Sequence, residues 1–521
     1  MIKIKNPVSR IIILLAAALF VFQFLFCSKP EITNRNSITI AFESAPTNLD
    51  PRKATDVPSS RIAQIIYSSL VKFNEKSEIV PDLSYKWDIP DSNTYIFHLR
   101  KGVKFHNGED LKAEDVEYTF KSIMDSGFKS PLRGSYTFLK EVKVLDDYTI
   151  RFDLNAPYAP FLSSMCVGIV PKRYAQKSGE DFGLKPVGSG PFRIVEILPD
   201  ERIILEANES YFGGKPGIKR IVFKAVKDET VRALELEKRE INFLENAFSP
   251  DTIEIFKNNS EIEIFHGEGT DYYYIGLNLK DSVLENKKVR QAIAYAIDRD
   301  IIIKSIERGM ARKATGMVPS SHWAYEKEVK DYDYNPERSK KLLDEAGFGD
   351  PDGDGPKARF KLVYKTTYEE RSRKFGEVLQ EFLRKVGISL EIKMYEWGTF
   401  YDDIKNGNFQ IYRLKWVGIT DPDQYYEVFN SKNFPPNGKN RGFYSNSEID
   451  YLTKLGRKTM NIDERKKIYS RIQKIIAEEL PYISLWHSDN VAVMSKGLKG
   501  FILYPRGEFN SIKDMCWEGI K

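Results

Sequence analysis

Ser189 lies between Gly188 and Gly190, and a serine among glycines is a natural first place to look for a nucleophile or a phosphate-binding loop. A hydrolytic serine needs a base and an orienting group, and no Gly-x-Ser-x-Gly or His-Glu-x-x-His run occurs in the sequence. No Gly-Lys-Ser/Thr ending follows to hold a phosphate. We therefore predict that residues 186–192 form a sharp backbone reversal, although the paired carboxylates of a glycosidase would leave no such motif.

Metal binding is the second chemistry that the residue types suggest. Residues 350–355 have acids at loop positions one, three and five and a glycine at six, as in a calcium loop. Position twelve is Lys361, where an EF-hand needs a bidentate Glu, so a solvated turn is the simpler interpretation. The histidines share no spacing suited to a metal, and we expect neither a metal nor a cofactor. They are His98, His106, His266, His322 and His487.

Cys27 is a third reactive group, and its position indicates export. Residues 1–10 carry three basic side chains and no acid, and residues 11–26 are apolar apart from Gln23. This is typical of a signal peptide over residues 1–26. The cysteine resembles the lipobox of bacterial lipoproteins, which implies acylation of Cys27 and a tether over residues 27–36. Phe26 departs from that pattern, which has a small residue there, and an uncleaved anchor is the alternative.

The composition fits an exported body built of two or three domains. The chain has 521 residues, of which 41% are hydrophobic and 29% are charged. The signal carries three of the five net positive charges, so the remainder is near balance and gives no reason to expect nucleic acid. Cys166 and Cys516 lie far apart in the sequence. We expect two buried thiols, with a disulfide as the alternative.

Strands and helices alternate in the second half, whereas the first half is richer in hairpins. The most periodic segment is 287–308, where Val289, Ile293, Ile297 and Ile301 recur every fourth residue and predict one long helix. Further helices are expected at 59–70, 111–120, 336–346, 370–386 and 463–480. Strands are expected at 37–42, 94–99, 203–207, 221–226, 389–394 and 410–417.

Five blocks match one family in order and spacing. They are residues 40–51, 99–108, 187–192, 289–299 and 334–337. Together they resemble the bacterial extracellular solute-binding proteins of family 5, the dipeptide/oligopeptide/nickel class that serves ABC importers. The resemblance covers nearly all of the chain after residue 37. It implies an α/β fold like that of the periplasmic binding proteins (type II, in the large cluster C form), with an extra lobe and a ligand cleft between lobes.

The resemblance also implies how the chain is divided. Lobe I would consist of residues 37–56, 187–275 and 490–521. Lobe II would span residues 57–186, and lobe III would span residues 276–489. The ligand would lie between lobes I and III, which close about a hinge. A pocket at a domain interface can enclose a small ligand completely, and closure creates a shape that a membrane partner can recognise.

The segment expected to touch the ligand is 413–423. In peptide-binding members a similar strand end carries Trp and, three residues later, an Asp that pairs with the amine of the peptide. A buried ammonium needs such a partner. Here Ile419 stands at that position, and the next acids are Asp421 and Asp423. Either could bind the amine, or the two could simply form a turn that caps a helix. Trp416, Val417 and Gly418 complete this candidate site.

A second ligand-facing loop is expected after the first strand, at Glu43, Ser44 and Ala45. Trp397 is a candidate wall of the cleft, and Arg441 is a candidate charge partner. Each of these residues could equally have a structural role, as an exposed turn or as part of the core.

The function that the resemblance implies is capture of a short peptide and its delivery to an ABC permease and its ATPase. The protein would be a membrane-anchored lipoprotein of the periplasm or cell envelope, and it would not be an enzyme. Binding of a non-peptide solute, sugar-like or a metal chelate, is the first alternative. An exported hydrolase and a sensor or adhesin with the same fold are the others.

Overall fold

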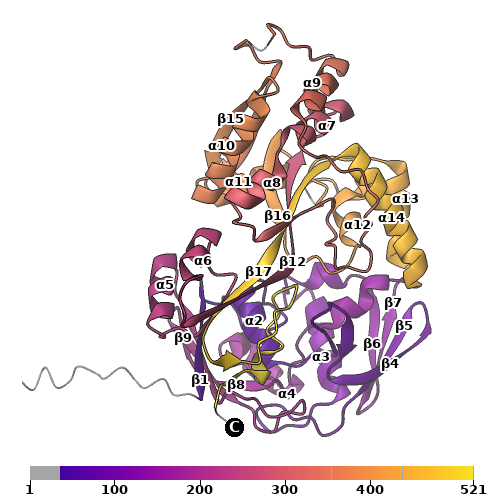
Figure 1. Cartoon of the computed structure of the whole chain (residues 1–521). Coiled ribbons are helices and arrows are strands. Elements are labelled where there is room, and N and C mark those ends of the chain that lie inside the picture. The colour runs from indigo at the N-terminus through magenta and orange to yellow at the C-terminus, as the bar shows by residue number, and fades with distance from the viewer. Residues whose placement is uncertain (1–35, 354, 437, 520–521) are drawn as a thin grey trace, which may run out of the picture.

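The computed structural model describes residues 36–353, 355–436 and 438–519. The predicted signal peptide, Cys27 and nearly all of the tether lie outside the described residues. Figure 1 shows two bodies, an upper one and a broader lower one, with strands β12 (Ile262–Leu277) and β17 (Tyr482–Ser495) running between them. Within the described ranges, no helix is long and apolar enough to cross a membrane.

A single mixed sheet extends through both bodies. Its path starts in the upper body, passes through β12 and β17, and ends in the lower body. On the upper side of β12 the sheet continues, from its edge inward, with β15 (Ile388–Tyr395), β14 (Phe360–Thr367) and β16 (Ile411–Trp416). Beyond β17 it continues with β11 (Phe243–Glu245), β1 (Ser37–Phe42), β10 (Arg220–Ala225), β9 (Arg202–Ala207) and β8 (Phe192–Leu198). The short strand β13 (Ala311–Lys313) also pairs with β17.

Smaller sheets lie in the lower body. The largest is antiparallel and runs β4 (Ser84–Asp91), β5 (Thr94–Leu99), β7 (Thr149–Leu154) and β6 (Leu139–Asp146). Two-stranded pairs are formed by β2 (Val71–Phe73) with β3 (Ile79–Pro81) and by β18 (Leu498–Lys499) with β19 (Cys516–Trp517). Cys166 and Cys516 are free, half-buried thiols, so the expectation of two separate thiols holds but their full burial does not.

Helices pack against the sheets of both bodies. Those of the lower body are α2 (Val57–Ile66), α3 (Ala113–Met124), α4 (Lys172–Ser178), α5 (Glu229–Glu237) and α6 (Pro250–Phe256). Those of the upper body are α7 (Lys287–Ala296), α8 (Arg299–Ser305), α9 (Pro336–Glu345), α10 (Glu370–Arg384), α11 (Trp397–Asn406), α12 (Gln424–Phe429), α13 (Ser447–Lys458) and α14 (Ile462–Glu479). Short 3-10 helices occur at Arg133–Tyr136, Ala159–Met165, Gly179–Gly183, Ser431–Asn433 and Ile512–Asp514.

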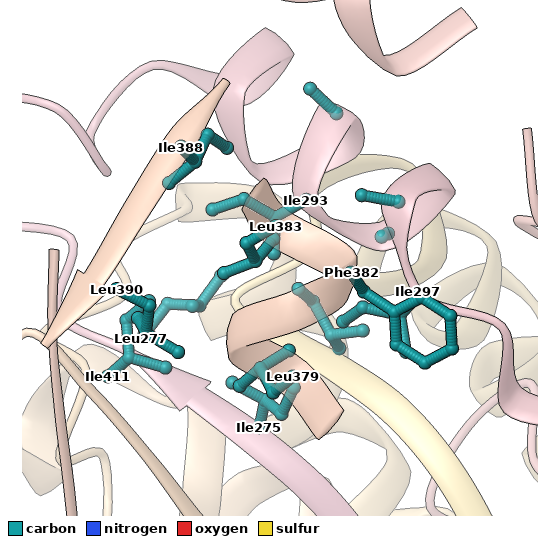
Figure 2. Packing of buried hydrophobic residues seen from close by; sticks show 14 of the residues in the cluster. Ile275, Leu277, Ile293, Ile297, Leu379, Phe382, Leu383, Ile388, Leu390 and Ile411 are labelled. Atoms are coloured by element: carbon teal, nitrogen blue, oxygen red, sulfur yellow. The ribbon is translucent and has the colours of Figure 1, made fainter. Parts of the chain in front are cut away.

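Each body has its own hydrophobic core. One cluster of the upper body, shown in Figure 2, contains Leu379 and Leu383 of α10, Leu390 of β15 and Ile275 of β12. The lower body has one cluster around the four-stranded sheet and others around β1 and β10. Helices α2 and α4, from the segment assigned to lobe II, contribute to the β1 cluster. The lobe boundaries themselves remain a prediction.

The long helix expected over residues 287–308 is two helices. Ile297 is extended, with ψ of 116°, and Asp298 begins α8 by accepting a hydrogen bond from the backbone N–H of Ile301. The apolar stripe therefore ends at Ile297, and Ile301 is 54% exposed. Asp298 interrupts the apolar repeat because its side chain caps a new helix and accepts a hydrogen bond from a backbone N–H that would otherwise be unpaired.

The backbone reversal predicted at residues 186–192 is present. Its two glycines are explained by close contact with the backbone at the end of α2. The N–H of Gly190 donates to the carbonyl of Ile66 at 3.0 Å, where α2 ends. A Cβ at Gly188 would lie 1.8 Å from that carbonyl oxygen, and one at Gly190 would lie 2.5 Å from the carbonyl oxygen of Ile65. Glycine is needed there because the two backbones touch.

Candidate functional site

Three parallel strands of the upper body end at one edge of the sheet. β14 pairs in parallel with both β15 and β16, so their carboxyl ends lie together. The residues immediately after these strands, or one position later, are large, apolar and mostly exposed: Tyr368 at 61%, Trp397 at 57% and Val417 at 62%. The carboxyl edge of parallel strands is the usual ligand-binding edge of an α/β sheet.

This edge points toward the lower body. In the antiparallel pair of β12 and β16, Tyr272 is opposite Trp416 and Leu277 is opposite Ile411. β12 enters from the lower body at Ile262, so the Trp416 end of β16 is the end nearer that body. The exposed apolar groups therefore lie where the two bodies meet.

The lower body presents an edge of the same kind. β1 runs parallel to β10 and β11, and β11 pairs with β17 so that Glu245 is opposite Ala492 and Phe243 is opposite Met494. β17 comes from the upper body, so the carboxyl ends of β1 and β11 point toward that body. The two carboxyl edges thus face each other across the crossing strands.

Glu43, Ser44 and Ala45 follow β1 at the lower edge. Glu43 is exposed and pairs with the buried Arg232 at 3.5 Å. Ser44 and Ala45 line an open pocket of about 190 Å³, together with Phe42 and residues of β8, β9 and β10. These three residues lie on the lower body, whereas Trp416 and its neighbours lie on the upper one.

Trp416 and Arg441 are brought into contact, and Trp397 is linked to Arg441 through Tyr401. The Arg441 guanidinium carbon lies 5.2 Å from the Trp416 ring centre and 5.1 Å from the Tyr401 ring centre. Its Nη2 donates to the Tyr401 hydroxyl at 3.0 Å. Trp397 stacks on Tyr401 at 5.4 Å, and Trp416 stacks on Tyr274 at 6.2 Å. We call these five residues the aromatic column.

The aromatic column carries an unneutralised charge. Arg441 is 6% exposed, and within the described ranges no carboxylate forms an ion pair with it. The Nε1 of Trp416 is buried and has no hydrogen-bond partner among the described residues. A buried cation without an acid is unusual, and here the faces of two aromatic rings lie against it in place of a counter-ion.

Arg413, two residues before Lys415 on β16, is a second cation that lies against an aromatic ring. Its Nη1 is buried without a hydrogen-bond partner in the described part of the chain, and its guanidinium lies 4.4 Å from the Phe375 ring centre. Its Nη2 donates to the hydroxyl of Ser372 at 3.3 Å. Arg413 and Arg441 therefore provide two cations near the end of β16 that form no ion pair with an acid among the described residues.

Asp421 and Asp423 are both already paired. Arg465, from α14, donates to the two carboxylate oxygens of Asp421 at 2.9 and 2.6 Å. Arg457, from α13, donates to those of Asp423 at 2.6 to 3.1 Å. Asp421 also accepts the backbone N–H of Asp423 at 2.7 Å, as a turn-forming aspartate does. Ile419, between Trp416 and this turn, is buried in the core.

A carboxylate that the sequence analysis missed lies next to this strand end. Asp271 of β12 accepts the backbone N–H of Gly418 at 3.1 Å and the ammonium of Lys415 at 2.7 Å. It precedes three tyrosines in a strand, and no motif marks it. Only the register of β12 against β16, which joins residues far apart in the sequence, reveals its position.

No group of three or more His, Cys, Asp or Glu side chains within the described ranges is arranged to hold a metal ion. The site is therefore built of exposed apolar side chains, two cations without acids, and one carboxylate at the corner of β12 and β16. This combination suits a small polar solute with charged ends and apolar parts.

The family model of the bacterial extracellular solute-binding proteins, family 5 Middle, matches residues 78–436. The Dipeptide-binding protein of Escherichia coli (strain K12) is 30% identical over 495 residues, which cover 89% of this chain and 92% of that protein. The Oligopeptide-binding protein AppA of Bacillus subtilis (strain 168) is 31% identical over 491 residues, covering 90% and 89%. Heme-binding protein A of Haemophilus influenzae is 30% identical over 512 residues, covering 92% of each.

Solved structures of solute-binding proteins are also similar to this chain. The periplasmic binding protein DppA from Helicobacter pylori, in complex with the peptide STSA, is 30% identical with a TM-score of 0.78, and the match covers 92% of this chain and 98% of that one. NikZ from Campylobacter jejuni, in complex with Ni(L-His), is 26% identical with a TM-score of 0.79, covering 92% and 99%. The mixed α/β fold of the periplasmic binding proteins, expected from the sequence, is therefore confirmed.

Proposed function

Because the chain belongs to the bacterial extracellular solute-binding proteins of family 5, we propose that it is the substrate-binding component of an ABC importer. It captures a short peptide between its two facing edges and passes it to a membrane permease driven by an ATPase. It does so as a binding protein and not as an enzyme.

The observation that carries this proposal is the pair of facing carboxyl edges joined by β12 and β17. The two bodies are joined by two strands and also touch where Arg457 of α13 lies over the Tyr158 ring, 5.7 Å from its centre, so a change in their relative angle would bend the strands and shift this contact. Closure would bring the Trp397 and Val417 edge against the loop that follows β1 and enclose a solute completely.

Peptide is the favoured ligand because of the chemistry of the upper edge. An extended peptide offers backbone groups to strand ends such as residues 416–418, a carboxylate for Arg413 or Arg441, and side chains for the exposed Tyr368 and Trp397. Affinity would then come chiefly from the backbone and the termini, giving broad specificity. The relatives named for dipeptides and oligopeptides support the same ligand class.

A non-peptide solute is the second candidate. It is favoured by the relatives whose names state heme binding or a complex with Ni(L-His), since these share the fold and the coverage. Such a ligand would also use cations without acids, because carboxylates occur in heme and in amino-acid chelates.

The protein works outside the cytoplasm, held to a membrane by a lipid on Cys27. Export follows from the N-terminal basic and apolar segments, and the lipid keeps the binding protein close to its permease.

Mass spectrometry of molecules released by denaturing the purified protein tests the ligand class directly. Peptides of two to about five residues are the expected product, and titration of the stripped protein with them should give micromolar or tighter binding, about −8 kcal/mol. Release of heme, a metal chelate or a sugar, with no peptide binding in the titration, would replace the peptide proposal by the second candidate.

A further inference from the structure

Building on the peptide-binding role proposed above, we propose that Asp271 of β12 is the carboxylate that binds the free amine of the ligand. The residue lies at the corner where β12 meets the end of β16, beside Gly418. It would bind the amine in place of the Asp that peptide-binding relatives are expected to have at the position that Ile419 occupies here.

The acids that follow Trp416 in the sequence are unsuited to this part. Asp421 and Asp423 each receive two or more hydrogen bonds from an arginine of α13 or α14. An amine could bind either of them only by displacing a mostly buried arginine, which would cost Arg465 its ion pair with Asp421 or Arg457 one of its two ion pairs, with Asp423 and Glu427.

Backbone geometry directs Asp271 toward the meeting of the two bodies. Between Glu268 and Tyr272 the register of β12 against β17 shifts, so that residues 269–271 stand opposite Ser488 alone. A Cβ at Gly269 would lie 2.4 Å from the Ser488 carbonyl oxygen, so the strands approach closely at this bulge. Bulges redirect side chains next to functional sites, and the next residue, Tyr272, is already opposite Trp416.

The carboxylate of Asp271 is accessible and only partly satisfied. Its side chain is 24% exposed. Oδ1 accepts one hydrogen bond from Gly418 and Oδ2 accepts one from Lys415, whereas a carboxylate offers about four acceptor directions.

Lys415 indicates which kind of group the site accepts. Its ammonium lies 2.7 Å from Oδ2 of Asp271, and its side chain is 42% exposed. The lysine ammonium carries the same charge and the same three N–H donors as a peptide amine. We infer that Lys415 neutralises Asp271 in the empty protein and moves into solvent when the ligand amine arrives.

The test uses a library of random di- to pentapeptides and the same library after N-acetylation, with the retained peptides quantified by mass spectrometry. The wild-type protein should retain free-amine peptides at least tenfold better than acetylated ones. Asp271→Asn should lower retention of the free-amine library about tenfold and leave the acetylated library unchanged, because only the free amine loses a charge-assisted hydrogen bond.

A matched control is Asp147→Asn, which removes a carboxylate from an exposed lysine pair in the lower body, where Lys112 lies 2.8 Å away. This variant should behave as the wild type with both libraries. Lys415→Gln should increase retention of free-amine peptides, because it removes the internal competitor. Thermal unfolding of each variant establishes that it is folded.

Several results would overturn the assignment. They are equal retention of both libraries by the wild type, equal loss of both in Asp271→Asn, reduced free-amine retention in Lys415→Gln, or loss of the amine preference in Asp421→Asn but not in Asp271→Asn. Failure of the wild type to retain either library would instead contradict peptide binding itself.

Discussion

The guanidinium of Arg441 covers one face of the Trp416 ring, with 5.2 Å between its central carbon and the ring centre. The two residues are 25 positions apart and reach each other from a loop and from the end of β16. Arg441 holds Trp416 at the edge where the two bodies meet, together with Tyr274, which stacks on the indole and is fully buried.

Arg441→Met should lower the free energy of unfolding by about 1–2 kcal/mol. The variant keeps the aliphatic stem but loses the cation–π contacts and the hydrogen bond to Tyr401. Urea unfolding measures the loss, and Arg441→Lys should recover part of it. An Arg441→Met protein as stable as the wild type would mean that burying the unpaired cation costs as much as its contacts contribute.

Arg457→Met should lower the free energy of unfolding by about 3 kcal/mol and Asp423→Asn by less, and the double variant should lose clearly less than the sum. The reason is that Arg457→Met leaves the buried Asp423 carboxylate without its arginine, whereas in Asp423→Asn Arg457 keeps its ion pair with Glu427 at 2.7 Å. Additive losses in this double-mutant cycle would show that the two side chains act independently. Free-amine preference in peptide binding should survive in Asp423→Asn.

Saturating peptide should make the protein more compact. If the facing edges close about β12 and β17, small-angle X-ray scattering should record a smaller radius of gyration with ligand than without it. The stripped protein without ligand is the control. An unchanged scattering profile under conditions where titration shows full occupancy would contradict closure.

Cys27→Ala should release the protein from membranes or leave the signal peptide uncleaved, because the thiol that accepts the lipid is gone. Fractionation and the migration of the mature band measure both outcomes. Ser28→Ala is the neighbouring control and should stay membrane-bound. A Cys27→Ala protein that fractionates and migrates as the wild type does would contradict lipidation.

Stability should fall as the pH rises through about 7 because of Glu245, the last residue of β11. Burial raises the pKa of its carboxyl from 4.5 to about 7, although Arg61, 4.0 Å away, opposes the shift. Between these two values the folded protein binds more protons than the unfolded chain, so the free energy of unfolding decreases with increasing pH.

Glu245→Gln should remove this part of the pH dependence, since the amide stays neutral at every pH. Relative to the wild type, the variant should gain stability between pH 5 and pH 8, by at most about 3 kcal/mol. Thermal unfolding across that range measures it, with the exposed Glu261→Gln as control. Parallel pH profiles for Glu245→Gln and the wild type would mean that Glu245 stays charged in the fold.

Local signals in the sequence were sufficient for most of the regular structure. The strands expected at 37–42 and 94–99 have those bounds, because alternation and β-branched residues are properties of the segment itself. The helix expected over residues 287–308 was wrong at one point, where the capping side chain of Asp298 outweighed the apolar period.

The candidate site was less accessible to sequence reasoning, because its charges are balanced by residues far away in the chain. The sequence around Asp421 and Asp423 gives no sign that they are paired, because their partners Arg465 and Arg457 lie more than 30 positions later. Asp271 lies 147 positions before Gly418, and strand register alone joins them. The roles of the predicted ligand-binding residues stay predictions until a ligand is identified.

Both crossing strands belong to the same continuous sheet, which has a mechanical consequence. The two bodies are not joined by a flexible linker. Rotating one relative to the other must twist β12 and β17, which are hydrogen-bonded to each other. If ligand closes the two bodies as proposed, part of its binding energy would go into twisting β12 and β17, and reopening would recover that energy.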